Sequence, residues 1–424
     1  MKKKYTVAIL GTGGRGFVYG TLLNKRKDDF EVVALCDFNP KQLEKENTLF
    51  RLPNEALFDN DEEFFKEKRA DVLIISTWDK YHVKQCLTAM KLGYDILLEK
   101  PMSDNEEEIK MLLDTQKMTG SKVAVCHDLR YGAGYKMLSK LIKDGVDGKL
   151  VTIDATERVA YWHQAQAYIR LQSEHNDVTF CTLLAKCCHD LDYIQHYAGA
   201  KCETVSSVGG FNYFIPENAP NGATKRCLDC PHKDTCTYSA KIIYIDGWKN
   251  AGCPSFIWPY NKVSLDIPTT EEKLYEGLKT GELGKCVFFS GVEENKTVVD
   301  HQMVLMHFEN GVDATLKMQY CANAGRRINI CGTEGEIVYD ELYDKIEIKP
   351  FGKPHTVLKV SELTDKDMGF AHGGGDAGLI SDLYAILNGE KTDYTTLEES
   401  AESHLIGIKA EESRHEHGAL KRVH

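Results

Sequence analysis

The stretch Tyr5-Thr6-Val7-Ala8-Ile9-Leu10-Gly11-Thr12-Gly13-Gly14-Arg15-Gly16 decides the fold of the first part of this chain. Its apolar half predicts a buried strand, and Arg15–Lys25 then has the pattern of a helix. The turn between them fits G-x-G-x-x-G, in which the glycines permit a tight turn, close approach of a pyrophosphate and close helix packing. We therefore expect a dinucleotide site lined by Gly11, Thr12, Gly13, Gly14 and Arg15, with phosphates at the helix N-terminus.

Asp37 follows the second expected strand, Glu31–Cys36, about 20 residues after the last glycine, where the dinucleotide fingerprint carries an acid. A carboxylate there accepts hydrogen bonds from ribose hydroxyls and repels a 2′-phosphate, so NAD is favoured over NADP. The alternative interpretation is that Asp37 caps the helix that begins near Pro40. Arg15 keeps NADP as the less favoured option.

Short apolar runs alternate with amphipathic ones over residues 1–130, which we take as the dinucleotide-binding domain. Runs rich in Val, Ile and Leu with helices between them predict a parallel sheet covered on both faces, an α/β Rossmann fold. The expected strands and helices after Cys36 are Val72–Ser76, Tyr81–Leu92, Asp95–Leu98, Asn105–Thr119, Lys122–Cys126 and Tyr135–Gly145.

A chain of 424 residues exceeds the roughly 250–300 residues of a single core, so we expect a second domain over residues 131–424. One strong helix is expected at Leu183–Tyr197, and an irregular insertion with cysteines at about 208–285. Period-2 alternation then predicts an antiparallel or mixed sheet. The expected strands and closing helices are Leu150–Ala155, Cys286–Phe289, Val298–Phe308, Asp313–Tyr320, Arg327–Ile330, Glu336–Tyr339, Leu379–Leu387 and Glu398–Arg414.

Composition excludes several classes of protein. Apolar residues make up 42% and charged residues 27%, which excludes collagen, low-complexity disorder and coiled coils. No apolar run reaches the roughly 18 residues of a spanning helix, and a net charge of −12 disfavours nucleic acid as a partner. The start Met1-Lys2-Lys3-Lys4 lacks a following h-region, and most of the 14 cysteines stand singly, so we expect a cytoplasmic protein with free thiols.

The segment Leu97-Leu98-Glu99-Lys100-Pro101, after the glycine-rich domain, resembles the Gfo/Idh/MocA oxidoreductases, the family of glucose-fructose oxidoreductase and inositol dehydrogenase. Further segments resemble the same family, and some of them one sugar- or glycoside-acting branch. These segments are Thr77 to His82, Arg130-Tyr131, Tyr161-Trp162-His163, Ala185-Lys186-Cys187-Cys188-His189-Asp190-Leu191-Asp192 and Cys331-Gly332-Thr333-Glu334-Gly335-Glu336-Ile337.

The resemblance implies a Rossmann domain followed by an α/β domain with an open, largely antiparallel sheet, and a sugar or cyclitol bound between them. It implies that Thr77, Trp78 and His82 lie on the nicotinamide side, with Glu99 and Lys100 at the cofactor. We also expect a homo-oligomer, a dimer or tetramer.

Three residues are the expected catalytic set. Lys100 ends a strand where ligands bind, and it can bind the reacting hydroxyl or exchange its proton. His189 is the better base because imidazole titrates near neutrality, and hydride transfer from an alcohol needs a base. Lys186 lies three residues before His189, on the same side of the expected helix. A structural histidine or a surface lysine is the alternative interpretation in each case.

The chain departs from the commonest family pattern, in which an Asp stands four residues before the histidine. Ala185 occupies that position, so His189 would be oriented by Asp190 or Asp192. Before Arg130, where the family often has Asn, the chain has Asp128.

The substrate set adds an expected stacking platform for a sugar face, Trp162 and His163. Glu157 and Arg130 are expected to contact hydroxyls, and His372 begins a glycine-rich loop, His372-Gly373-Gly374-Gly375-Asp376, that the family branch places by the substrate. Asp376 was also a candidate helix cap. An ordinary surface loop is nearly as good an interpretation of both segments.

The insertion contains C-x₂-C-x₅-C at Cys227, Cys230 and Cys236, followed by Cys253. Four thiolates at such spacing predict a closed tetrahedral zinc site that would hold an irregular insertion together. His232 is the alternative fourth ligand, and free cysteines are the alternative interpretation.

The leading hypothesis is an NAD-dependent dehydrogenase of a sugar, glycoside or cyclitol hydroxyl carbon. The alternative is a glycoside hydrolase that retains NAD and cleaves through transient oxidation and elimination. A non-catalytic NAD or sugar sensor would need neither Lys100 nor His189.

Overall fold

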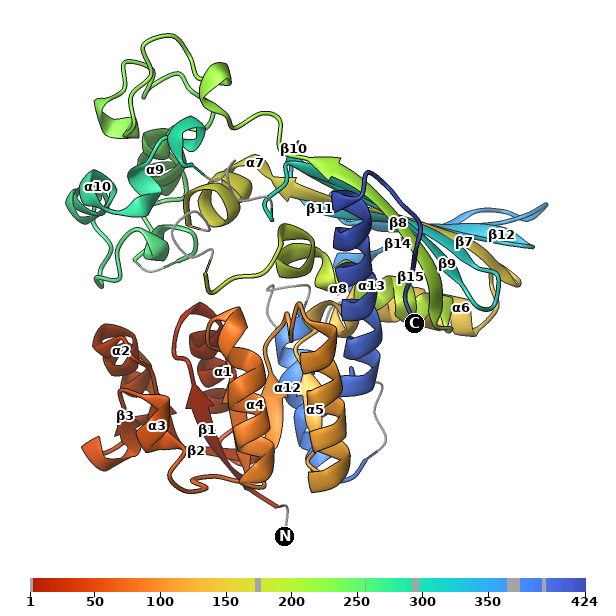
Figure 1. Ribbon diagram of the computed structural model, residues 1–424, viewed down its shortest axis with the longest axis horizontal. Helices are drawn as coiled ribbons and strands as arrows, with labels where there is room; N and C mark the ends of the chain where they lie inside the picture. The colour runs from red at the N-terminus through yellow and green to blue at the C-terminus, as the bar shows by residue number, and fades with distance from the viewer. Residues whose placement is uncertain (1–2, 172–176, 256, 292–296, 364–373, 391–393) are drawn as a thin grey trace.

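The structure is a computed structural model that describes residues 3–171, 177–255, 257–291, 297–363, 374–390 and 394–424 (Figure 1). The described residues form two sheets, one of six strands near the N-terminus and one of nine strands built from β7 onward. Both match the expected fold class, a Rossmann sheet followed by an open and largely antiparallel one.

The first sheet is parallel throughout and has the strand order β3-β2-β1-β4-β5-β6. Its central strands are buried on both faces, which explains their unbroken Val, Ile and Leu runs. The strands are β1 Tyr5–Leu10, β2 Phe30–Cys36, β3 Leu57–Phe58, β4 Val72–Ile75, β5 Asp95–Leu98 and β6 Val123–Val125. The helices between them are α1 Gly14–Lys25, α2 Pro40–Phe50, α3 Asp61–Phe64, α4 His82–Lys91 and α5 Glu106–Thr119.

Local sequence sets the ends of these helices. At the start of α5 the Asn105 side chain accepts the backbone N–H of Glu108, and at its end Gly120 adopts a left-handed φ of 70°. The strand order reverses between β1 and β4, and ligands of such sheets bind beyond the carboxyl ends of the strands at that point. The glycine-rich loop that follows β1 lies there.

Helix α12, Gly375–Leu387, packs on this first sheet although it comes from the far end of the chain. Leu379, Leu383 and Ile386 share a buried cluster with Val7 and Ile9 of β1. The domain boundary at residue 130 stays a prediction. Helix α12 packs with the first domain although it lies near the C-terminal end of the chain.

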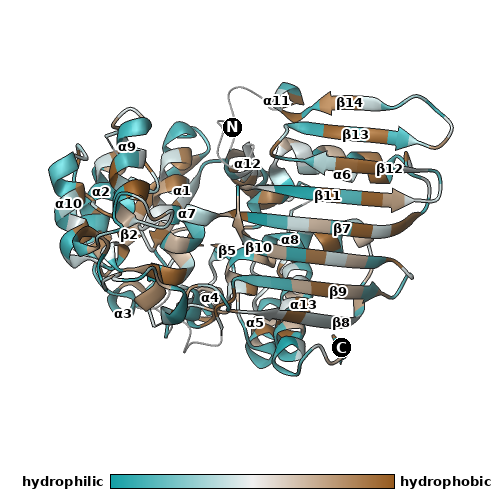
Figure 2. Ribbon diagram, turned by 90° about the horizontal axis from the view of Figure 1, so that it is seen from above, coloured by the Kyte–Doolittle hydropathy of each residue, from teal (hydrophilic) through white to brown (hydrophobic). Residues whose placement is uncertain are grey.

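The second sheet has the order β14-β13-β12-β11-β7-β10-β9-β8-β15, with β7 and β10 as its parallel pair. Residues of β9 alternate between buried and exposed, as the period-2 pattern predicts (Figure 2). The strands are β7 Leu150–Ala160, β8 Cys202–Gly210, β9 His301–Phe308, β10 Asp313–Ala322, β11 Gly325–Gly332, β12 Gly335–Asp340, β13 Lys345–Pro350, β14 Thr356–Lys359 and β15 Lys421–Arg422.

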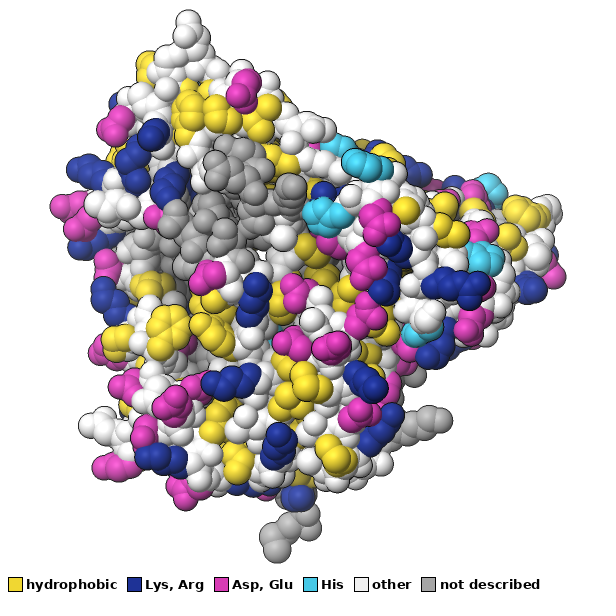
Figure 3. Space-filling model, viewed as in Figure 1, with side chains coloured by type: hydrophobic (Ala, Val, Ile, Leu, Met, Phe, Trp, Pro, Cys, Tyr) yellow, Lys and Arg dark blue, Asp and Glu magenta, His cyan; other side chains and the backbone are white. Residues whose placement is uncertain are grey.

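Three helices lie along one face of the second sheet: α6 Ala133–Lys143, α8 Thr182–Ala198 and α13 Leu397–His415 (Figures 1 and 2). On the face of the molecule drawn in Figure 3, acidic and basic side chains are interspersed over both halves. Among the helices that the structure describes, none has the length and apolar character needed to cross a bilayer.

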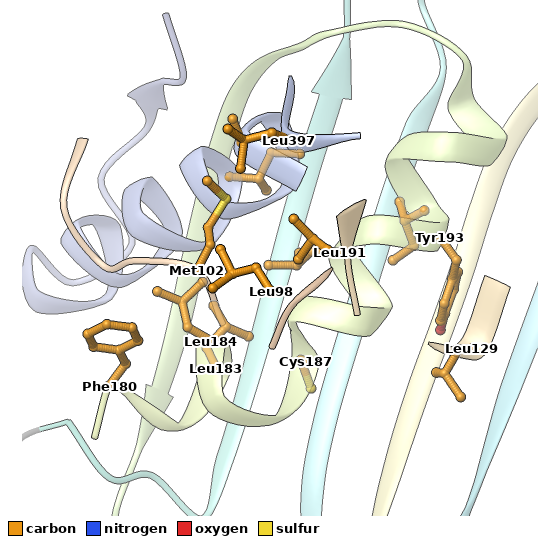
Figure 4. Close-up of a cluster of buried hydrophobic side chains, with 14 of the residues drawn as sticks. Leu98, Met102, Leu129, Phe180, Leu183, Leu184, Cys187, Leu191, Tyr193 and Leu397 are labelled. Carbon is orange, nitrogen blue, oxygen red and sulfur yellow. The ribbon is translucent and has the colours of Figure 1, made fainter. Parts of the chain in front are cut away.

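One core joins the two halves at α8. Leu98 and Met102 of the first domain gather with Leu184 and Leu191 of α8 and with Leu397 at the start of α13 (Figure 4). All five side chains are buried. This packing presses the end of β5 against α8 and so fixes Lys100, two residues after Leu98, beside that helix.

The insertion between β8 and β9 has an apolar core, which it shares with Ala165 and Ile169 of the segment after β7. Phe214, Tyr244, Trp248, Leu274 and Phe288 are buried in it. Its helices are a π-helix Lys241–Asp246, α9 Gly247–Asn250 and α10 Glu271–Thr280.

The expected strand Cys286–Phe289 was wrong. Residues Val287–Phe289 form a short 3-10 turn whose apolar side chains enter the core of the insertion. A short apolar run has the same pattern in either structure, and here tertiary packing decided it.

Candidate active site

The glycine-rich loop has the geometry that the motif requires. Gly11 has a φ of +89°, and a Cβ built on it would lie 2.5 Å from the Ser76 carbonyl oxygen. A Cβ on Gly16 would lie 2.1 Å from the Gly11 carbonyl oxygen, whereas Gly13 has no atom within 4 Å of its Cβ position. The loop is therefore tight against β4 and open at Gly13, where a phosphate needs room.

Asp37 holds this loop in place. One oxygen of its carboxylate accepts the Thr12 backbone N–H at 2.7 Å and the Thr12 hydroxyl at 3.1 Å. The other oxygen accepts the N–H of Asn39 at 2.8 Å. The side chain that caps α2 is Asn39, which corrects the interpretation of Asp37 as a helix cap.

Arg15 points into the protein and not toward the end of β2. Its guanidinium contacts Glu99 at 2.6 Å and Asp376 at 2.6 Å, and lies 3.5 Å from Asp128. These contacts tie the helix after the glycine loop to α12 and to the end of β5. Asp376 serves this ion pair and makes no side-chain cap for α12, whose N-cap residue is Gly374.

Thr77, Trp78 and His82 follow β4, at the same edge of the sheet. Both ring nitrogens of His82 are engaged, with the Pro101 carbonyl at 2.8 Å and the Thr77 carbonyl at 3.2 Å. His82 is buried, so it braces the turns after β4 and β5. The Thr77 hydroxyl donates to Gln85, and the Trp78 ring is half-buried.

Lys100 reaches from the end of β5 to α8, where its ammonium donates to the Ala185 carbonyl at 3.0 Å. Burial disfavours the charged form, but Cys188, Glu99 and other acidic groups outweigh it and leave the pKa of Lys100 above its ordinary value. Lys100 is therefore an ammonium at neutral pH, which suits a hydrogen-bond donor better than a base.

His189 lies on the same face of α8, one turn after Ala185. Its Nδ1 is 3.6 Å from a carboxylate oxygen of Asp128, a residue of the turn Asp128–Tyr131 that follows β6. Both side chains are buried, and Asp128 also contributes to the raised pKa of Lys100. The structure thus brings Lys100, His189 and Asp128 together at the carboxyl edge of the first sheet.

Asp190 and Asp192, the partners expected for His189, are occupied elsewhere. Asp190 accepts two hydrogen bonds from Arg326, at 2.8 and 3.1 Å. Asp192 accepts two from Arg130, at 2.6 and 2.8 Å, and Arg130 also contacts Glu399. Arg130 therefore links α8 to α13, and its expected contact with the substrate stays a prediction.

Lys186 belongs to a second cluster of charges between α8 and the second sheet. Its ammonium lies 3.3 Å from Glu157 of β7, and Glu157 also pairs with Arg326 at 2.8 Å. Arg326 and Lys186 hold the pKa of the Glu157 carboxyl below its ordinary value despite burial. Lys186 is thus paired with Glu157, whereas Lys100 donates to the Ala185 carbonyl.

Trp162 and His163 form a short helical turn after β7, Tyr161–His163, and meet Trp258 of the insertion. The ring centroids of Trp162 and Trp258 are 4.7 Å apart, and those of His163 and Trp258 are 5.0 Å apart. Burial, with Lys186 and Lys100 nearby, holds the pKa of His163 well below its ordinary value, so the ring is neutral. Three aromatic faces therefore gather near the two lysines.

The predicted cysteine set is assembled differently. Cys227, Cys230 and Cys236 line one small cavity with Cys286, whereas Cys253 is exposed and lies outside it. Burial raises the pKa of Cys236 above its ordinary value and the pKa of Cys286 to about 11, which keeps both as thiols. Within the described ranges no group of three or more His, Cys, Asp or Glu side chains is arranged to hold a metal ion, so the predicted zinc finds no support.

Sequence reasoning missed the partners that come from far along the chain. Asp128, Arg326, Trp258 and Cys286 each meet a predicted site residue, and of these the sequence pointed to Asp128 alone, as a departure from the family pattern. His372 lies outside the described residues.

The comparisons with known proteins agree with this architecture. Residues 5–127 match the family described as an oxidoreductase family with an NAD-binding Rossmann fold, and residues 139–421 match the C-terminal alpha/beta domain of the same family. The chain belongs to the Gfo/Idh/MocA oxidoreductases.

Relatives within this family carry several names. YteT of Bacillus subtilis, named as an oxidoreductase, is 23% identical over 89% of this chain and 88% of its own length. An inositol dehydrogenase of Halalkalibacterium halodurans is 22% identical over 47% of this chain and 54% of its own. A glycosyl hydrolase family 109 protein of Akkermansia muciniphila is 29% identical over 37% of this chain and 34% of its own. Levoglucosan dehydrogenase, solved with NADH and levoglucosan, shares the fold with a TM-score of 0.69 and 15% identity over 99% of this chain and all of its own.

Proposed function

We propose that this Gfo/Idh/MocA oxidoreductase transfers a hydride between NAD and a hydroxyl-bearing carbon of a sugar, glycoside or cyclitol. The observation that carries the proposal is the contact between His189 and Asp128 beside the Lys100 ammonium, at the strand edge that also bears the glycine loop. A sensor would need no titratable imidazole at that place.

The three side chains divide the work. NAD, when bound, supplies the hydride acceptor. His189 takes the hydroxyl proton at Nε2, because its Nδ1 faces Asp128 at 3.6 Å. Asp128 orients the ring and stabilises the imidazolium that forms, while the Lys100 ammonium donates to the substrate oxygen and favours its negative charge.

This arrangement accounts for the departure from the family pattern. Ala185 removes the usual carboxylate from α8, and its carbonyl receives Lys100 instead. Asp128 supplies a carboxylate from the turn after β6, where the family often has Asn. We propose that the two changes compensate each other.

NAD is the proposed cofactor in preference to NADP. Asp37 presents a carboxylate at the end of β2, and Arg15, the residue that kept NADP as an option, pairs with Glu99 and Asp376. No cation from Arg15 is then left for a 2′-phosphate.

The substrate class rests on the aromatic group of Trp162, His163 and Trp258. Flat rings beside cationic side chains suit the apolar face and the hydroxyl groups of a sugar ring. Names of relatives in the family, an inositol dehydrogenase among them, support the same class.

A second candidate is an NAD-retaining glycoside hydrolase, which the relative in glycosyl hydrolase family 109 favours. One experiment separates the two. Purified protein is mixed with NAD and a panel of sugars, cyclitols and aryl glycosides, while NADH absorbance and aglycone release are followed together. Net NADH supports the dehydrogenase, aglycone without net NADH supports the hydrolase, and neither product with any compound contradicts both.

We further propose a cytoplasmic homo-oligomer, a dimer or tetramer, without nucleic-acid or membrane partners. Support comes from the net charge of −12 and from apolar side chains exposed on the second sheet. These side chains are Val151, Val208, Met303, Leu305 and Val357. Light scattering of the purified protein measures the oligomeric state.

A further inference from the structure

Lys262 of the insertion lies over the glycine-rich loop of the first domain. A Cβ built on Gly14 would be 3.3 Å from the Lys262 ammonium nitrogen and 3.8 Å from the carbon next to it. Figures 1 and 2 agree that the insertion, with α9 and α10, sits above α1 and α2. A cation from the second half of the chain thus reaches the first turn of α1.

No carboxylate among the described residues forms an ion pair with the Lys262 ammonium. Lys262 is an exposed residue. Burial of the surrounding region lowers the pKa of Lys262, with no nearby carboxylate to raise it. A lysine held in this way is stabilised by an anion that arrives from outside the chain.

Lys45 adds a second positive charge near Lys262. Lys45 of α2 lies 3.8 Å from the centre of the Phe17 ring. Burial lowers the pKa of Lys45 to about 8, Glu46 opposes this, and Lys262 adds to it. The Glu46 carboxyl is itself buried, which raises its pKa to about 8 and weakens it as a counter-ion.

The helix beneath these lysines offers unpaired N–H groups to an anion. Helix α1 has no acidic residue in its first turn, and its N-cap residue, Gly13, makes no side-chain cap. Gly13 is also the loop position with free space around it. The N-terminus of a helix attracts negative charge, and a lysine opposite it completes a two-sided site.

The turn that carries Lys262 is firmly anchored. The Lys262 N–H donates to the Pro259 carbonyl at 3.1 Å, and the Val263 N–H donates to Tyr260 at 2.9 Å. Tyr260 and Val263 pack on the apolar core of the insertion. The Gln166 side chain also donates to the Pro259 carbonyl at 3.4 Å, which joins the turn to the segment after Trp162.

We propose that Lys262 binds the pyrophosphate of the dinucleotide from the side opposite α1, so that the insertion closes over the bound cofactor. The proposal rests on the NAD site of the proposed function and adds a ligand contact from outside the Rossmann domain. Its chemical class is a doubly charged diphosphate ester held between backbone N–H groups and one ammonium. The contact between Lys262 and the pyrophosphate, called the clasp below, slows release of the cofactor. It does not determine which sugar is bound.

The test measures binding, so it does not depend on any substrate. Affinities of ADP and adenosine are determined by calorimetry for the unmutated protein and for Lys262→Ala, Lys262→Arg and Lys273→Ala. Lys262→Ala should weaken ADP about tenfold, the value of one lost charge-assisted hydrogen bond, and leave adenosine within about twofold. Lys262→Arg should retain most ADP affinity, and Lys273→Ala, whose lysine pairs with Glu276 on α10, should behave as unmutated.

A second measurement uses the unmutated protein. Labelling with an amine-reactive reagent should be slowed by ADP at Lys262 and unchanged at Lys273, as read by mass spectrometry. Equal ADP affinity in Lys262→Ala together with unprotected Lys262 would overturn the clasp and leave the NAD site intact. Equal loss of adenosine would overturn the pyrophosphate assignment, and no ADP binding in the unmutated protein would contradict the NAD site itself.

Discussion

Two clusters of buried charge lie against α8, and they differ in how far their charged groups are paired with one another. The first joins His189 and Lys100 to Asp128 at the carboxyl edge of the Rossmann sheet. The second joins Lys186, Glu157, Arg326 and Asp190 against the second sheet. Both contain a lysine and carboxylates, yet their geometry suits different tasks.

In the second cluster the two cations are paired with the two carboxylates. Arg326 donates to Asp190 at 2.8 Å and forms an ion pair with Glu157 at 2.8 Å, and all three side chains are buried. The first cluster contains a titratable imidazole and a lysine that rests on a backbone carbonyl. Residue types alone therefore do not distinguish a catalytic group from a structural one. The distinction depends on whether each charged group is paired with a group of opposite charge.

The largest effect is expected from His189→Ala. Removing a positioned base should lower kcat by about 10²–10⁴-fold, while the NADH affinity changes little. Steady-state kinetics and NADH fluorescence titration measure the two quantities, and His307→Ala, an exposed histidine paired with Asp313, is the matched control. Near-normal turnover in His189→Ala would show that the first cluster is as structural as the second.

Arg326→Met tests the second cluster by stability. It should lower the free energy of unfolding by about 3–5 kcal/mol, because Asp190 would stay buried without its cation and Glu157 would keep only Lys186. Urea unfolding measures the change. The partly exposed Lys349, which pairs with Glu336 and Glu347, gives the control Lys349→Met, with an expected loss below about 1 kcal/mol. A similar small loss in Arg326→Met would contradict a closed structural cluster.

Asp128→Asn tests whether the carboxylate of the first cluster contributes to catalysis. Losing the carboxylate charge 3.6 Å from the imidazole nitrogen should lower kcat by about 10–100-fold, which corresponds to about 1.4–2.8 kcal/mol of lost electrostatic stabilisation, with KM little changed. Kinetics of Ala185→Asp in the Asp128→Asn background provide the matched experiment, since it returns the carboxylate to the family position on α8. Recovery of kcat supports orientation of His189 by Asp128, whereas a further loss speaks against compensation.

Lys186→Met should have the smallest effect on turnover. Its ammonium is paired with Glu157, so kcat should fall less than about tenfold, and any change should appear mainly in KM. Lys100→Met, measured in parallel, should lower kcat much more, because its ammonium lies beside His189. Equal losses in the two variants would remove the distinction between the clusters.

Much of the fold could be predicted because its signals are local. The glycine motif after β1, the Val- and Ile-rich strands and the alternation of β9 are all read within about ten residues. The strands β13 and β14 and the packing of α12 could not be read in this way. The 3-10 turn at Val287 shows the limit, since an apolar run buries itself equally well as a strand or a turn.

The residues of the candidate site also fall into two groups, those that local motifs predict and those that only the three-dimensional structure reveals. Lys100, His189 and the glycine loop follow from motifs, and the structure brings the first two together beside Asp128. The partners of these residues depend on three-dimensional packing, because Asp128 and His189 come from separate elements. Pairing of Arg130 with Asp192, and of Cys227 with the cavity at Cys286, had no signal in sequence spacing.

The position of α12 has a consequence for the order in which the protein is made. The ribosome completes all six strands of the first sheet long before it reaches α12, Gly375–Leu387. Until that helix emerges, the apolar face of β1 that Leu379 and Leu383 cover stays open to water, and Arg15 lacks Asp376. The first domain can therefore complete its packing only near the end of synthesis, after every strand of the second sheet except β15 has been made.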